Sequence, residues 1–183
     1  MKRFSTPVAL IMAATLMIHC PLLGFDDSAE DSTMEGVMLV VALGELEING
    51  NYDDNFGGTH EVNARRDLSS GDPTGYWNSG TTERSVVEFS NESRILYAVS
   101  GVPSWCTGQG TTYPSCECFT AETCFGRFVW TYYKEKLYYC ESVYNKPDLQ
   151  TAKSESAPAN PDQPDTDGCG TFNSSWTRMD RRE

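Results

Sequence analysis

Side chains that could perform acid–base or nucleophilic chemistry are scarce in this sequence. The 183 residues include two histidines, His19 and His60, and only His60 lies beyond the first twenty residues. A serine, cysteine or metal hydrolase normally depends on a histidine as its base or ligand. The motifs G-x-S-x-G and H-E-x-x-H and the phosphate-binding P-loop are all missing from the sequence. We therefore predict a protein without enzymatic activity and without a cofactor.

One segment carries oxygen ligands that could suit a cation. In "DDNFGG", residues 53–58, Asp53 and Asn55 alternate ahead of two glycines, as ligands do in calcium loops. The rest of an EF-hand is missing, and Asp, Asn and Gly are also the residues that a tight turn favours. The turn is the preferred interpretation, with Asp53 and Asn55 as the alternative calcium ligands. Asp53 and Asp54 are adjacent, so along a strand they would point to opposite faces rather than flank a bond.

Aromatic side chains are concentrated in "FGRFVWTYYKEKLYYCESVYNKPD", residues 125–148, which contains eight of them. A turn at 134–135 makes this segment a hairpin with Phe128, Trp130 and Tyr139 on one buried face. The expected pairs are Tyr132 with Leu137 and Trp130 with Tyr139. The alternative is a ring platform that binds a sugar or a lipid, with Trp130, Tyr132 and Tyr139 as the ligand wall.

Seven cysteines are present, and setting aside Cys20 leaves an even number for pairing. The remaining six are Cys106, Cys116, Cys118, Cys124, Cys140 and Cys169. In an exported chain they predict three disulfides, whereas a zinc site would need a fourth ligand close to "CECFTAETC". Joining Cys116 to Cys118 would strain the chain, so Cys106 and Cys124 should each pair with one of those two. Cys140 and Cys169 would then pair with each other.

The first residues have the pattern of an export signal. Lys2 and Arg3 precede an apolar run that is too short to span a bilayer as a mature helix, which predicts a signal peptide over 1–19. Cys20 follows the run directly and is the predicted site of lipidation, although His19 stands where a small residue is usual. Residues 20–44 form an acidic spacer and a short apolar segment, for which we expect a short helix within 32–44.

From residue 45 onward the pattern is that of strands and turns. We predict a mainly all-β fold for 45–183, a single antiparallel domain that forms a small barrel or sandwich. Its expected strands are 46–52 and 59–63, a short one near Trp77, a hairpin over 85–99, the aromatic hairpin, and a final strand over 169–180. The hairpin over 85–99 should pair Phe89 with Ile95, Val87 with Tyr97 and Ser85 with Val99. Phe172 and Trp176 of the final strand should return to the core.

Two segments interrupt the predicted strands. The cysteine-rich insert, 101–126, has almost no aliphatic residue, so disulfides must brace it. The loop 146–168 is rich in Pro, Asp and Ser and should be exposed, apart from a helical turn at 148–153. The formal net charge of the whole chain is -12. That charge repels a phosphate backbone, so nucleic acid is excluded as a partner.

The order of several motifs resembles a group of uncharacterised surface lipoproteins of spirochaetes. The motifs are "NFGG" in the first turn, "YYC" in the aromatic hairpin, "GCG" after the Pro/Asp-rich loop and a terminal "SWT". The likeness covers about residues 46–179, and the insert and "MIHC" depart from it. The resemblance implies a protein that is anchored by lipid at the outer membrane or cell surface, and it brings no known activity.

Two functions follow as hypotheses. In the first, a lipid-anchored surface protein uses its disulfide-braced loop, 106–124, to contact a host or envelope protein, or has a structural role. In the second, the protein is a small-molecule carrier with a lipocalin-like barrel. A carrier needs a hollow barrel, whereas the first hypothesis predicts a filled core.

Overall fold

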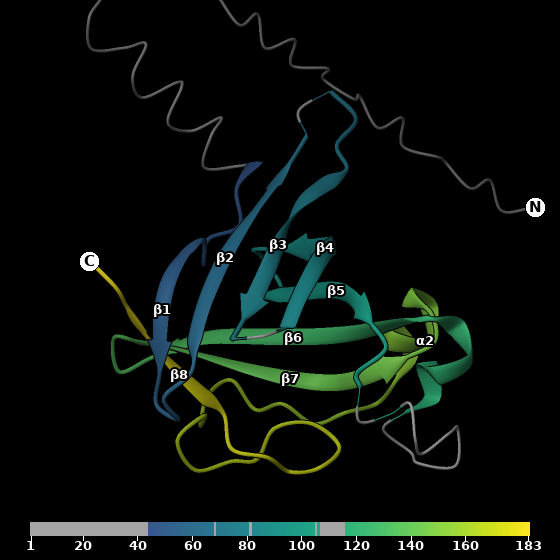
Figure 1. Ribbon diagram of the computed structural model, residues 1–183. Coiled ribbons are helices and arrows are strands. Elements are labelled where there is room, and N and C mark those ends of the chain that lie inside the picture. The colour runs from purple at the N-terminus through teal and green to yellow at the C-terminus, as the bar shows by residue number, and fades with distance from the viewer. Residues whose placement is uncertain (1–43, 68, 81, 105, 107–115) are drawn as a thin grey trace, which may run out of the picture.

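The computed structural model describes residues 44–67, 69–80, 82–104, 106 and 116–183 (Figure 1). The signal peptide, Cys20 and nearly all of the predicted helix at 32–44 therefore lie outside the described residues. Among those residues, eight strands form a closed barrel in which each strand pairs antiparallel with the next and the last pairs with the first. The strands are β1 (Gly50–Asp54), β2 (Thr59–Arg66), β3 (Pro73–Ser79), β4 (Thr82–Ser90), β5 (Ile95–Gly101), β6 (Thr123–Tyr133), β7 (Lys136–Lys146) and β8 (Thr177–Arg181). This confirms the predicted antiparallel all-β fold, as a barrel rather than a sandwich.

The alternation of the sequence explains how each strand contributes to the barrel wall. In β2, "THEVNARR", His60, Val62 and Ala64 are buried while the residues between them are exposed. Successive side chains of a strand point to opposite faces, so the three buried positions face the interior. Closing β1 against β8 leaves the barrel without a free sheet edge.

Large side chains fill the interior of the barrel. Trp77 and Trp130 are fully enclosed, and the rings of Trp77 and Phe128 lie 4.9 Å apart between centroids. Tyr139 packs edge-on against Trp77 at 5.0 Å. The predicted common face of Phe128, Trp130 and Tyr139 is confirmed, because all three belong to this one cluster.

Residues 45–49 close the end of the barrel at which β1 begins. Leu46 and Ile48 are buried in the core cluster, and the Tyr52 hydroxyl donates to the Ile48 carbonyl oxygen at 3.0 Å. Asn49 fixes the segment by bonding both backbone groups of Ala64, at 2.8 and 2.9 Å. The prediction of a strand over 46–52 was therefore wrong at its start. The first four residues form a turn that plugs the barrel, and the strand begins at Gly50.

Two hairpins test the predicted registers. The turn at 134–135 is confirmed, and it pairs Trp130 with Tyr139. The register proposed for β4 and β5 was wrong next to the turn, where Phe89 pairs with Leu96 and Glu88 pairs with Tyr97. A bulge at Val87 then shifts the register by one residue, so that the farther predicted pair, Ser85 with Val99, does form.

Three disulfides join the six described cysteines. They are Cys106–Cys116, Cys118–Cys124 and Cys140–Cys169, which agrees with the expected pairing. The Cys140–Cys169 bridge packs with Trp176 against the outer side of the aromatic hairpin. A short 3-10 helix, η2 (Glu117–Ala121), lies within the insert, and α2 (Leu149–Ser154) corresponds to the predicted helical turn.

Phe172 differs from its prediction. The predicted final strand, 169–180, begins only at Thr177. Trp176 is buried, but in the cluster with the Cys140–Cys169 bridge outside the barrel rather than in the core. Phe172 is 57% exposed and rests on Tyr144 with 5.7 Å between ring centroids. The reason is local, because Cys169 and Ser174 exchange two backbone hydrogen bonds and leave Phe172 at the tip of the turn between them. Figure 1 shows this segment running outside the barrel wall before the chain enters β8.

Candidate functional site

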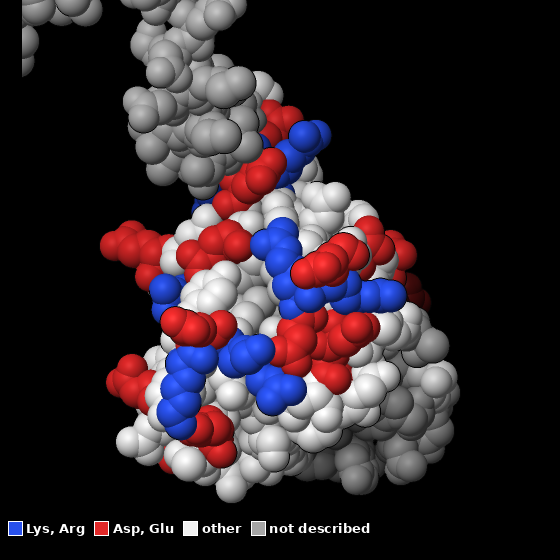
Figure 2. Space-filling model, turned by 90° about the vertical axis from the view of Figure 1, so that its left-hand side faces the viewer, with Lys and Arg blue, Asp and Glu red and all other residues white. Residues whose placement is uncertain are grey.

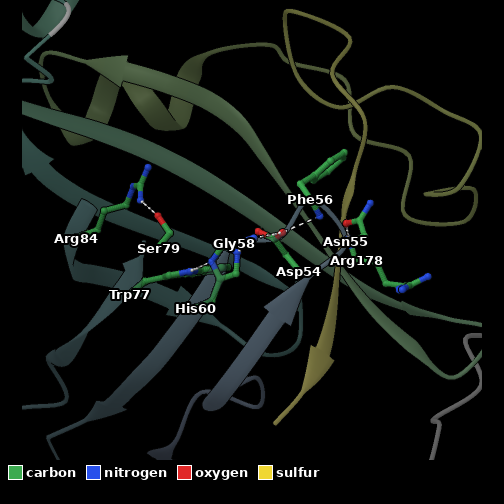
Figure 3. Close-up of polar contacts among 9 residues, drawn as sticks. All are labelled: Asp54, Asn55, Phe56, Gly58, His60, Trp77, Ser79, Arg84 and Arg178. Atoms are coloured by element: carbon green, nitrogen blue, oxygen red, sulfur yellow. Dashed lines mark hydrogen bonds and ion pairs between the residues drawn. The ribbon is translucent and has the colours of Figure 1, made fainter. Parts of the chain in front are cut away.

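The end of the barrel opposite the plug has a polar interior. Side chains from five strands meet there, and we call them the polar end: Asp54, His60, Ser79, Arg84 and Glu141. Their inward direction follows from strand pairing, since each is in register with, or two residues from, a buried core residue. Figure 3 shows four of them together with Trp77, whose indole nitrogen points toward His60.

His60 is held between an acid and an indole. Its side chain is 4% exposed, its Nε2 lies 2.8 Å from Asp54 Oδ2, and Trp77 Nε1 lies 3.2 Å from its Nδ1 (Figure 3). An indole N–H can only donate, so Nδ1 must accept and the ring proton must sit on Nε2, which donates to Asp54. Both ring nitrogens are occupied, so His60 would have to break a hydrogen bond before acting as a base or a metal ligand.

Asp54 organises the turn between β1 and β2. Its Oδ1 accepts hydrogen bonds from the backbone N–H groups of Phe56 and Gly58, both at 2.8 Å. Gly58 permits this approach, because a Cβ at that position would lie 2.4 Å from Asp54 Oδ2. Desolvation raises the pKa of Asp54, but the hydrogen bonds from Gly58, His60 and Phe56 outweigh it and hold the pKa below its ordinary value.

A pH dependence of stability follows from this carboxylate. Since the pKa of Asp54 is lower in the folded state than the unfolded value of about 3.9, its stabilising effect is complete above that pH and is lost as the pH falls through the folded-state pKa. Urea unfolding between pH 7 and pH 3 should therefore show the stability difference between wild type and Asp54→Asn shrinking below about pH 4. Asp162→Asn, on an exposed loop, is the control. A difference that stays constant down to pH 3 would contradict the role given to Asp54.

Arg84 and Glu141 form a second polar pair at this end. Their charged groups approach to 3.4 Å with side chains 17% and 19% exposed, and Arg84 also donates to Ser79 Oγ at 2.7 Å. The guanidinium lies over the Phe128 ring at 5.4 Å. Burial raises the pKa of Glu141 and the charge of Arg84 opposes that rise. The charges of Arg84 and Glu141 are therefore compensated by partners inside the barrel, and this arrangement favours a structural role.

The calcium interpretation of "DDNFGG" finds no support in the geometry. Asp53 Oδ1 faces Arg182 Nε at 3.4 Å, while Asn55 Oδ1 accepts the backbone N–H of Arg178 at 2.8 Å. Those contacts pin the turn to β8, as Figure 3 shows for Asn55 and Arg178. The described residues contain no group of three or more His, Cys, Asp or Glu side chains placed to hold a metal ion.

The proposed ligand wall is not assembled as a set. Trp130 is fully buried in the packed core, and burial raises the pKa of Tyr139 to about 12. Tyr132 is 48% exposed and lines a hollow of about 180 Å³ whose lining includes neither Trp130 nor Tyr139. The prediction of one wall of three rings was therefore wrong. Trp130 and Tyr139 face a core that other aromatic residues fill, whereas Tyr132 lies on the same face of β6 but next to the turn at the end of the barrel, where it stays half-exposed.

Sequence reasoning missed the polar end altogether. His60 was noted as a lone histidine, but its partners are Asp54 at the end of β1 and Trp77 of β3, seventeen residues away. The available signal was the alternation of β2, which places His60 on the same face as Val62 and Ala64. A histidine on that face needs buried polar partners.

The remaining predicted site, Cys20, lies outside the described residues. Within the described part of the chain, every helix is too short or too polar to cross a lipid bilayer. Comparisons with protein-family models, with curated proteins and with solved structures found no match.

Proposed function

We propose that the protein is exported, anchored by lipid at the cell surface, and acts there through contacts with another protein rather than through catalysis. Its barrel serves as a rigid support, and the disulfide-braced insert, 101–126, is the contact surface. The partner is a host or envelope protein. The resemblance of the motifs to surface lipoproteins of spirochaetes favours the same location.

The filled interior is the observation that carries this proposal. A carrier barrel encloses its ligand in a hollow, whereas small barrels filled by side chains have a structural interior. Here Trp77 and Trp130 are fully enclosed and Phe128 is 2% exposed. A closed wall around a packed core is stiff, which suits a support that presents loops.

The disulfides support both the location and the choice of contact surface. Disulfides persist in oxidising compartments, so three bridges agree with export. Two of them brace the insert, and Glu117 of η2 is tied to the barrel by an ion pair with Lys146 Nζ at 2.8 Å. Glu117 is thus held against the barrel, and a side chain that is held in place before binding loses less conformational entropy when a partner arrives.

The anchor is tested by the mass of the mature protein. Expressed in a bacterium that processes lipoproteins, the wild type should be found in the membrane fraction, starting at Cys20 and carrying lipid mass. Cys20→Ser should lose that mass and leave the membrane fraction, while Cys118→Ser, which alters a cysteine of the insert, should keep both. A soluble wild-type product that starts beyond Cys20 would contradict the anchor and leave export intact.

The carrier with a lipocalin-like barrel is the second candidate function. The hollow that Tyr132 lines, together with Tyr52, Leu137, Met179 and Arg181, is the observation that favours it. Its volume of about 180 Å³ is below the roughly 300–1,000 Å³ of typical ligand pockets. Native mass spectrometry of the protein purified from the envelope of the cell that produces it separates the contact protein from the carrier. A stoichiometric small molecule that is lost in Leu137→Trp would favour the carrier.

A further inference from the structure

A row of four polar side chains crosses the outer wall of the barrel. Asn51 of β1 is in register with Glu61 of β2, Glu61 with Asn78 of β3, and Asn78 with Glu83 of β4. Their chain neighbours Tyr52, His60 and Trp77 are buried, so the row itself faces outward. Amide and carboxylate groups therefore alternate across four strands, at strand spacings of about 4.8 Å.

This row lines a hollow of about 350 Å³. The other lining residues are Thr59, His60, Gly80, Thr82 and Arg182. Its volume lies within the range of about 300–1,000 Å³ that ligand sites occupy, and it is nearly twice that of the hollow beside Tyr132. Hydroxyl, amide and charged groups make up most of this lining, which offers little to a lipid tail or an aromatic ligand.

Contacts around the row hold it in place before any ligand arrives. The Tyr76 hydroxyl donates to Glu61 Oε1 at 2.5 Å, and the backbone N–H of Arg182 donates to the Asn51 carbonyl oxygen at 2.9 Å. Arg182 Nε also lies 3.4 Å from Asp53 Oδ1, which balances its charge locally. Figure 2 shows that acidic and basic side chains are interspersed on the β1 side of the molecule, without a large area of one sign.

Asn78 gives a separate indication that a ligand could supply a hydrogen-bond donor to the row. Its Oδ1 is enclosed and has no hydrogen-bond partner among the described residues. A buried acceptor without a donor costs free energy, and most such atoms in native proteins are satisfied. A ligand hydroxyl that donated to this oxygen, with a small turn of the side chain, would remove that cost.

We propose that this outer groove binds an uncharged saccharide. Carboxylates accept hydrogen bonds from sugar hydroxyls, and amides can both accept and donate them, so a row of alternating amides and carboxylates fits the neighbouring hydroxyls of a sugar ring. The two carboxylates of the row disfavour phosphates and acidic sugars by repulsion. The proposal goes beyond the function proposed above, since the groove lies on β1–β4 and shares no residue with the insert at 101–126.

The test is a titration of the oxidised full-length protein, kept in a zwitterionic detergent that contains no sugar. The probes are the neutral disaccharides lactose, maltose, cellobiose and diacetylchitobiose, with glucuronic acid as the charged comparison. Backbone amide chemical shifts should move in β1–β4 and stay constant in β6 and β7 for at least one neutral probe. Glucuronic acid should bind that groove more weakly.

Variants of the row decide whether the groove is the site. Glu83→Gln keeps the shape of the side chain and Asn78→Ala removes the unsatisfied oxygen, and each should weaken the best neutral probe by about tenfold, the value of one charged or buried hydrogen bond. Glu92→Gln, on the exposed turn after β4, should leave binding unchanged. The proposal is overturned if no neutral probe shifts the β1–β4 amides, if both row variants bind as wild type does, or if glucuronic acid binds equally well. None of these results bears on the anchor or on the insert.

Discussion

Replacing Trp130 by alanine is expected to lower the free energy of unfolding by about 3 to 5 kcal/mol. The indole is fully buried in the core of the barrel, so its removal leaves a cavity that the closed wall cannot collapse to fill. The change also removes the donor to Glu47 Oε1, which lies 2.7 Å from the indole nitrogen and belongs to the plug at 45–49. Equilibrium unfolding in urea at pH 7 measures the loss.

Two variants separate the contributions of Trp130. Trp130→Phe retains most of the ring volume and removes the hydrogen bond to Glu47. The free energy of unfolding should therefore fall by about 1 kcal/mol for the lost hydrogen bond and by a smaller amount for the lost packing. Tyr132→Ala is the matched control two residues along β6, where a half-exposed ring should cost about 1 kcal/mol or less. Near-wild-type stability in Trp130→Ala would contradict the packing role given to the indole.

The aromatic hairpin could be predicted from the sequence because its determinants are local. A turn at 134–135 sets the register of β6 and β7, and alternation then assigns each ring to one face of the sheet. Alternation also explains why Cys140 lies on the face opposite Trp130, where it packs with Val129 and Tyr138. A short turn between strongly patterned strands leaves few alternative registers.

The hairpin of β4 and β5 shows why a register predicted from the turn and from alternation can be wrong. Its turn takes up Asn91 to Arg94, with Arg94 at a positive φ of 53°, and β4 carries a bulge at Val87. A bulge adds one residue to a single strand without a sequence signature of its own. The error of one position near the turn is cancelled farther along, so Ser85 and Val99 pair as predicted although Phe89 and Ile95 do not.

The plug and the polar end depend on contacts between distant segments. Glu47 bonds an indole 83 residues away, and Arg84 meets Glu141 across 57 residues. Which polar groups meet inside a barrel is decided by strand order and stagger, and no short motif encodes either of them. The turn motif "NFGG" was visible, and the contacts of Asp54 with this turn and with His60 are local, but the contact of His60 with Trp77 depends on the pairing of β2 with β3.

Removing the disulfide between Cys140 and Cys169 is expected to lower the free energy of unfolding by about 3.5 kcal/mol. The bridge spans 29 positions of sequence, and closing a loop of that length in the unfolded chain has about this value in the chain-entropy model. The double variant Cys140→Ala with Cys169→Ala removes the bridge without burying a new polar group. Urea unfolding under identical conditions gives the loss.

The Cys118–Cys124 bridge provides the matched control. It spans only 6 positions, for which the same model gives about 2 kcal/mol, so its double alanine variant should be the less destabilised of the two. An equal or larger loss at Cys118–Cys124 would show that loop length does not govern the effect.

The Cys140–Cys169 bridge should also hold the approach to β8, because the long connection from α2 has few buried apolar residues of its own. Trp176 packs on the bridge and on Val129 and Tyr138, so losing the bridge should expose this face of the hairpin. Limited proteolysis should then cut the double variant within 155–176 faster than wild type, while the interior cluster around Trp77 stays protected. Non-reducing peptide mapping of the wild type is the direct check, since finding Cys140 joined to a cysteine of the insert would refute this bridge and the local pairing together.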